Sequence, residues 1–186
     1  MYEIAERLGP IARELLTAWS RLPRDGLVPD RRNFDPMAIT PILPVVSVIQ
    51  REGEDRWRFR LVGTEIERRW CRVFTGTDCF EGVSPGAAAV MRREFRCIVE
   101  WPCGSRSRRR VELRSGRVLA IETLRLPLRG SDNMTSQILS CSGELGGTSF
   151  EAADPTREII KIVEQEYFDI GAGCPPAGAM IWCVEP

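Results

Sequence analysis

The chain has 186 residues, of which 43% are hydrophobic and 28% charged, and its formal net charge at pH 7 is zero. The length fits one domain with extensions at both ends, and the balanced charge excludes a global field that would draw nucleic acid to the chain. No run of eighteen apolar residues is present, so no membrane span is expected. Histidine is absent, which removes the usual general base and the commonest ligand of zinc and haem.

The cysteines and the N-terminus indicate a reducing compartment. Seven cysteines are present, an odd number, and no two of them stand at C-x-x-C spacing. This pattern argues against a structural zinc site, and we expect all seven to be reduced and structural. The N-terminus has no basic segment followed by an apolar run, so we expect no secretory signal and a cytoplasmic protein.

Residues 1–22 are predicted to be helical. Apolar residues recur there at alternating spacings of four and three and form one seam: Ile4, Leu8, Ile11, Leu15, Ala18 and Leu22. Gly9-Pro10 interrupts the seam, and because proline is tolerated in a first turn, the firm helix should begin at Pro10. The helix either lies on the domain's own sheet or joins two copies of the chain. Residues 23–44 contain five prolines and should form an irregular connection.

The next segments predict a hairpin followed by helices. Residues 45–50 form a continuous apolar run typical of a buried strand, and residues 57–62 alternate, with Trp57, Phe59 and Leu61 on one side. The helical segments follow in chain order: a short helix over 64–70, a loop with a helical turn over 71–82, and a long helix over 85–101.

Three more strands are predicted over residues 105–114, 117–128 and 137–145. This order predicts an α+β domain over residues 45–145, with a five-stranded antiparallel sheet and helices on one face. Residues 1–44 and 146–186 would extend it at the two ends. The C-terminal extension is expected to contain a helix, because Asp154-Pro155 resembles a helix start and an apolar stripe follows at Ile159, Ile162, Val163 and Ile170.

Three segments resemble the small, stand-alone PAS-domain proteins of bacteria: RLVGTEI (Arg60 to Ile66), FTGTD (Phe74 to Asp78) and LRLPL (Leu124 to Leu128). The resemblance covers roughly residues 19–145. It departs from the family at Cys71-Arg72, where Gly-Arg often precedes the Thr-Gly step. It implies a PAS-like fold and a sensing or docking role without catalysis, and it brings no established ligand.

The resemblance also implies a pocket where the sheet curls against the short helices. The candidate lining residues are Phe59, Leu61, Thr64, Ile66, Trp70, Cys71, Phe74, Phe95, Val99, Ile121, Arg125 and Cys141. The alternative is that these side chains fill the core and leave no cavity. Light-sensing PAS domains carry a reactive cysteine at the place of Cys71, but the strands lack the Asn/Gln set that would hold a flavin. The sequence therefore argues against a flavin photosensor and identifies no cofactor.

Arginines gather in the second half of the chain. From Gly104 to Arg129 there are eight arginines and two glutamates, and Arg106, Arg108, Arg110 and Arg114 alternate along one strand face. Such a face can bind an acidic protein surface or the chain's own acidic C-terminal segment, or it can simply be solvated. No aromatic residue is interleaved, so nucleic-acid bases have no stacking platform.

These observations predict a sensory or interaction module that forms a homodimer and acts through contact with a protein partner. A ligand or partner would shift it between two packings of its helical flanks against the sheet. The alternative is a small-molecule-binding protein whose pocket is its whole function.

Overall fold

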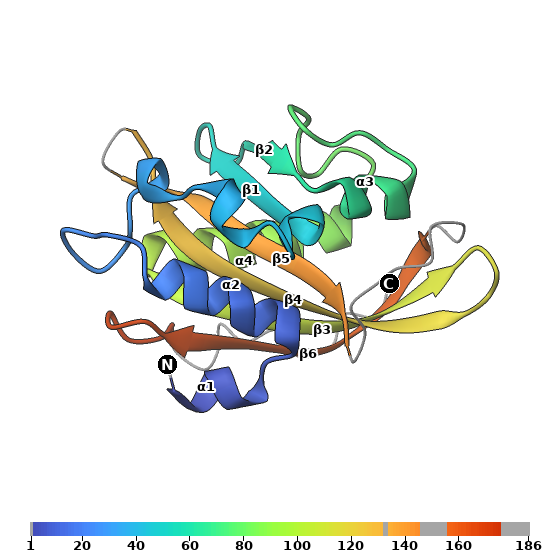
Figure 1. The fold of residues 1–186 in the computed structure, drawn as a ribbon. Helices are drawn as coiled ribbons and strands as arrows, with labels where there is room; N and C mark the ends of the chain where they lie inside the picture. Colours follow the sequence, from blue (N-terminus) through green and yellow to red (C-terminus); the bar gives the residue numbers. More distant parts are fainter. Residues whose placement is uncertain (1, 132–133, 146–155, 176–186) are drawn as a thin grey trace.

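The computed structural model describes residues 2–131, 134–145 and 156–175 (Figure 1). Within these ranges six strands form one antiparallel sheet in the order β2-β1-β5-β4-β3-β6. The strands are β1 (Val46–Arg51), β2 (Trp57–Val62), β3 (Cys103–Leu113), β4 (Val118–Arg129), β5 (Thr135–Glu144) and β6 (Thr156–Asp169). The predicted α+β class and antiparallel sheet are confirmed. The described residues form six strands where five were predicted, and helices lie on both faces of the sheet where one was predicted.

The described residues contain four α-helices, and two of them begin at a proline. They are α1 (Tyr2–Arg7), α2 (Pro10–Ser20), α3 (Thr64–Trp70) and α4 (Pro85–Glu100), with short 3-10 turns η1 (Arg31–Asn33), η2 (Pro36–Ile39) and η3 (Leu43–Val45). Pro10 opens α2 as predicted, after an extended Gly9. Ser84 caps α4 by accepting a hydrogen bond from the Ala87 amide at 3.4 Å. None of the helices in the described part of the chain has the length and apolar content to cross a bilayer.

Helices cover both faces of the sheet, with α2 in front and α4 behind in Figure 1. Strand periodicity separates two cores, because Leu139 of β5 packs with α2 and the neighbouring Ile138 packs with α4. The N-terminal helix therefore lies on its own sheet. Its predicted seam is used within the protomer, where Leu15 is fully buried and Ile4 and Leu8 are 5% and 3% exposed. A homodimer stays a prediction, and it would have to use other surfaces.

The C-terminal segment corrects our expectation of a helix. It forms β6, which pairs antiparallel with β3 from Cys103↔Asp169 to Leu113↔Thr156. Isoleucine, valine and aromatic residues favour strands, and without β6 the long strand β3 would be an unpaired edge. The spacing of the apolar residues is compatible with a helix, but pairing with the distant strand β3 makes the segment a strand. The expected helix start, Asp154-Pro155, lies outside the described residues.

A bulge corrects a second expectation, that Trp57, Phe59 and Leu61 share one side. The β1–β2 register shifts between Val48 and Ile49. Phe59 therefore packs with the α4 core, whereas Leu61 packs with the α2 core. The alternating sequence of β2 does not reveal where a bulge occurs.

We expect Gly104→Ala to weaken the docking of β6. Gly104 lies opposite Phe168, and a Cβ at this position would overlap the Phe168 ring. The free energy of unfolding should fall by about 1–3 kcal/mol, and hydrogen exchange should accelerate in β6. Urea denaturation and exchange mass spectrometry measure both. Gly53→Ala is the control, because its added Cβ would have no neighbour within 4 Å. Equal effects of the two substitutions would contradict the packing of β6 on β3.

Candidate functional site

A polar cluster lies between α3, α4 and the sheet. We name it the arginine cluster: Arg69 of α3, Glu94 of α4, Ser105 and Arg109 of β3, Thr123 and Arg125 of β4, and Ser142 of β5. Strand alternation turns Ser105 and Arg109 toward α4 and turns Arg106 and Arg108 to the opposite face. Beside the apolar residues that pack under α4, this face therefore carries polar side chains on β3 and β4.

A buried ion pair holds one side of the arginine cluster. The Arg125 side chain is 7% exposed and its Nη1 lies 2.8 Å from Glu94 Oε1, whose side chain is 5% exposed. The Ser105 hydroxyl donates to the same oxygen. The Arg125 guanidinium also lies over the Phe95 ring, 5.5 Å from its centroid. These contacts offset part of the cost of removing two charges from water.

The other two guanidiniums are held through hydroxyl and carbonyl groups. Arg109 donates through Nη2 to the Thr123 hydroxyl, which lies 3.2 Å from the Ser142 hydroxyl. Arg69 donates through Nη2 to the Ser142 carbonyl at 3.2 Å. The Thr123 hydroxyl is neutral, so it orients the Arg109 guanidinium without cancelling its charge.

Electrostatics shows that the three cations affect one another. Arg109 as a whole residue is half-buried, but its Nε is fully buried. Burial, and then the positive charge of Arg125, lowers the pKa of the Arg109 guanidinium to about 9. Burial lowers the pKa of Arg69 to about 10, against the opposing influence of Glu65 and Glu144. Arg69 and Arg109 both remain cations at neutral pH.

Some pocket residues predicted from the sequence meet beside this cluster. Phe95 and Val99 of α4 are buried in the α4 core, and Phe59 packs against it. The Phe59 and Phe74 rings meet edge to face, with centroids 5.6 Å apart. Arg125 is a member of the arginine cluster itself.

Other predicted pocket residues lie elsewhere. Leu61 and Cys141 belong with the α2 core on the opposite face, and Ile121 belongs to a third cluster near the β3–β4 turn. Ile66 and Trp70 are half-buried in α3, and Thr64 and Cys71 are exposed. Arg69, Glu94 and Arg109 were missed. The alternation of Ser105, Ser107 and Arg109 on the second face of β3 was the available signal.

The cysteines in the described residues are free thiols, and Cys183 lies outside these residues. Burial raises the pKa of Cys103 and of Cys141 to about 12, which keeps both thiols protonated and unreactive at neutral pH. Cys71 ends α3 in the left-handed region, at φ 50°.

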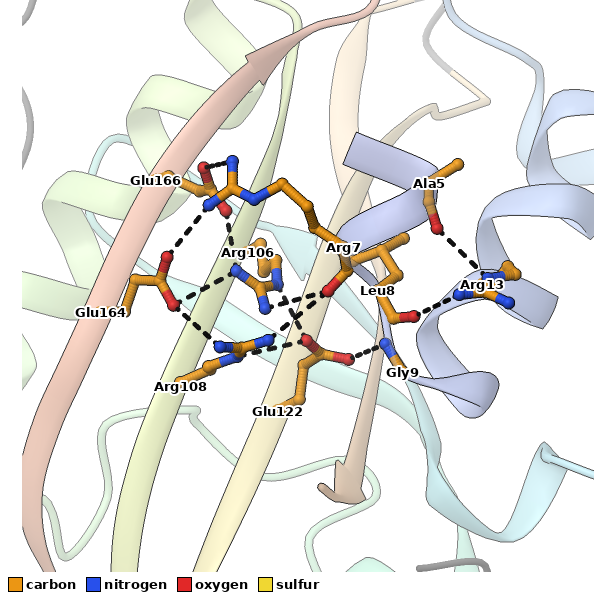
Figure 2. Close-up of polar contacts among 10 residues, drawn as sticks. All are labelled: Ala5, Arg7, Leu8, Gly9, Arg13, Arg106, Arg108, Glu122, Glu164 and Glu166. Carbon is orange, nitrogen blue, oxygen red and sulfur yellow. Dashed lines mark hydrogen bonds and ion pairs between the residues drawn. The ribbon is translucent and has the colours of Figure 1, made fainter. Parts of the chain in front are cut away.

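The opposite face carries a second polar assembly, shown in Figure 2. We name it the flank network: Arg7 and Gly9 at the joint of α1 and α2, Arg106 and Arg108 of β3, Glu122 of β4, and Glu164 and Glu166 of β6. Arg106 is its centre and is 1% exposed. Its Nε lies 2.8 Å from Glu122 Oε1, and its Nη1 lies 2.8 Å from Glu166 Oε1 and 3.3 Å from Glu164 Oε2.

The flank network reaches the main chain of the joint. The Gly9 amide donates to Glu122 Oε2 at 2.8 Å, and Arg106 Nη2 donates to the Arg7 carbonyl at 3.2 Å. The Arg7 side chain pairs with Glu164 at 3.1 Å and with Glu166 at 2.9 Å. The joint is thus bonded to three strands of the sheet.

The burial of Arg106 corrects our expectation of an exposed arginine face. Carboxylates of β6 pair with Arg106 and Arg108, so the acidic C-terminal segment meets the basic strand within one molecule. Arg108 is half-buried, and Arg110 and Arg114 are exposed. A role of Arg110 and Arg114 in binding a partner stays a prediction.

Comparisons with known proteins identify a family for the chain. The chain matches the PAS domain family over residues 9–142. Among solved structures it is similar to one described as an RNA-binding light-oxygen-voltage receptor, with 15% sequence identity and a TM-score of 0.40. That match covers 66% of this chain, which spans only 37% of the length of the receptor chain. The search of curated proteins found no match.

We expect Glu94→Ala to destabilise the protein strongly. The substitution leaves the buried Arg125 without the carboxylate at 2.8 Å. Breaking such a pair from one side costs about 3–5 kcal/mol in the free energy of unfolding, measured by urea denaturation. The control is Glu100→Ala on the same helix, whose side chain is 55% exposed and whose loss should cost about 0–1 kcal/mol. A loss at Glu94 as small as that at Glu100 would show that the pair is not buried in solution.

Proposed function

The chain belongs to the PAS domain family, and we propose that it is a sensory module that signals to a protein partner through helices α1 and α2. PAS domains are generally sensory, non-catalytic modules. The observation that carries the finer proposal is the hydrogen bonding of the α1–α2 joint by Glu122 and Arg106. Main-chain atoms of the joint thereby depend directly on the position of sheet side chains.

The joint is sensitive to small movements of the sheet. Hydrogen bonds weaken steeply with distance and angle, so a shift of β3 against β4 changes both contacts at once. Packed elements respond to such shifts by changing between discrete arrangements. The flank network therefore supports a change between a docked and a released α1.

Release of α1 would create a surface for a partner. The helix has six residues, too few to be stable alone in water. Ile4 of α1 and Leu8, which directly follows α1, are 5% and 3% exposed. Detachment would uncover both side chains and the apolar groups beneath them, and an exposed apolar patch of this kind binds other proteins.

The energy involved suits a switch. Hydrogen bonds to charged groups contribute about 1.5–3 kcal/mol each, so a few of them hold the docked state. A ligand or partner that prefers one arrangement by a similar amount changes which state dominates.

A second candidate function is small-molecule binding by the core. The observation that favours it is the arginine cluster, where Arg109 and Arg125 lie on the α4 face of the sheet and Arg69 of α3 donates to the Ser142 carbonyl.

We expect Glu122→Gln to loosen α1. The substitution removes the negative charge that pairs with Arg106 at 2.8 Å and weakens the acceptor of the Gly9 amide. Amide exchange in Tyr2–Arg7 should accelerate about tenfold or more, while α4 keeps its protection. Exchange mass spectrometry on the full chain measures both regions.

Glu6→Gln is the matched control, because it removes a carboxylate from the exposed side of α1. It should leave exchange in α1 within about twofold of the unmodified protein. Unchanged exchange of α1 in Glu122→Gln would refute the proposed role of the flank network.

A further inference from the structure

We propose that the arginine cluster binds a small anionic molecule, through carboxylate or phosphate oxygens that bridge Arg69, Arg109 and Arg125. The inference adds a class of ligand to the proposed sensory function. Binding is measured directly and without reference to α1, so its failure would leave the proposal for the flank network standing.

The charges of the cluster favour an anion. Arg109 donates to the Thr123 hydroxyl, which contacts the Ser142 hydroxyl, and Arg69 donates to the Ser142 carbonyl. Arg125 lies two residues from Thr123 on the same face of β4, and Glu94 is the carboxylate that contacts it. Glu65 and Glu144 act on Arg69. Arg109 is the least compensated, since its hydrogen-bond partner is the neutral hydroxyl of Thr123. Burying cations together without matching anions is costly, and a bound anion would remove that cost.

The hydrogen-bond donors of the cluster point to the same class of ligand. Within the described residues, the buried Nε atoms of Arg109 and Arg125 have no hydrogen-bond partner. A guanidinium presents its N–H groups as a rigid fork that fits a carboxylate or a phosphate with two parallel bonds. Gln165 Nε2 of β6 is also buried without a partner in the described chain, and Gln165 lies opposite Ser107 on the same face. Unsatisfied buried donors are rare in native proteins unless a bound group completes them.

The position of the cluster suits a ligand that changes the packing of the domain. Arg69 comes from α3, whereas Arg109 and Arg125 come from adjacent strands of the sheet. An anion held by all three would tie α3 to the sheet. The β3–β6 register shifts between Arg108 and Arg109, with Val163 of β6 as the extra residue, and bulges often lie next to functional sites.

Calorimetric titration of the full chain tests the proposal, with inorganic phosphate in one arm and succinate in the other, at low ionic strength. We expect saturable binding of at least one anion. Binding of phosphate alone would indicate a phosphate-bearing ligand, and binding of succinate alone would indicate a carboxylate. Native mass spectrometry of freshly purified protein gives a second readout, a retained anionic mass.

Substitutions on one strand separate the site from general charge effects. Arg109→Gln should weaken anion binding about tenfold or more, and Arg109→Lys should keep the charge but lose the fork and bind at an intermediate level. The control is Arg110→Gln, the next residue on β3, which is exposed. It should change affinity by about twofold at most.

Stability distinguishes a binding role from a structural one. Without added anion, Arg109→Gln should unfold at a urea midpoint no lower than that of the unmodified protein, because it removes a poorly compensated buried charge. The proposal is wrong if neither anion binds and no mass is retained. It is equally wrong if Arg109→Gln and Arg110→Gln weaken binding to the same extent, or if Arg109→Gln lowers the midpoint while leaving affinity unchanged.

Discussion

The buried guanidinium of Arg106 is the interaction on which this architecture depends. It meets carboxylates from β4 and β6 and a carbonyl from the α1–α2 joint. A cation that is 1% exposed requires such partners, since leaving it unpaired would cost several kcal/mol. One side chain therefore makes the docking of the C-terminal strand and the docking of the N-terminal flank depend on each other, although Arg7 and Glu166 are far apart in the sequence.

The two polar assemblies share a single strand. Residues of β3 alternate between the sheet faces, so Arg106 and Arg108 enter the flank network while Ser105 and Arg109 enter the arginine cluster. Strand β4 repeats the arrangement, with Glu122 on one face and Thr123 and Arg125 on the other. A movement of β3 or β4 caused on one face of the sheet therefore also moves the side chains that the same strand places on the other face. No chain of intermediate side chains is needed to connect the two faces.

Much of the fold could be predicted because local patterns agree with it. Glycine and proline mark the starts of α2 and α3, and the bounds predicted for β2 are those observed. The errors arose where distant segments decide. The segment that forms β6 has a stripe compatible with a helix, and its strand state depends on pairing with β3, about fifty residues earlier. The arginines of β3 look solvated in sequence because arginine is usually exposed, and their burial depends on α4, α1 and β6 together. The candidate site was only partly predictable for the same reason. Phe95 and Arg125 were identified from the sequence. Arg69, Glu94 and Arg109 can be recognised as one site only in the folded chain, where α3, α4 and β3 come together.

Coupling between the two faces must act in both directions. If an anion at Arg109 changes the position of β3 and thereby favours one state of α1, then a partner that captures the released α1 changes the affinity for that anion by the same factor. The effect requires only that the two states of α1 differ in the geometry of β3. The contacts of Arg106 with the Arg7 carbonyl and of Glu122 with the Gly9 amide supply that difference, because neither bond can form once α1 leaves the sheet. A sensor built on this strand would therefore register its partner as well as its ligand.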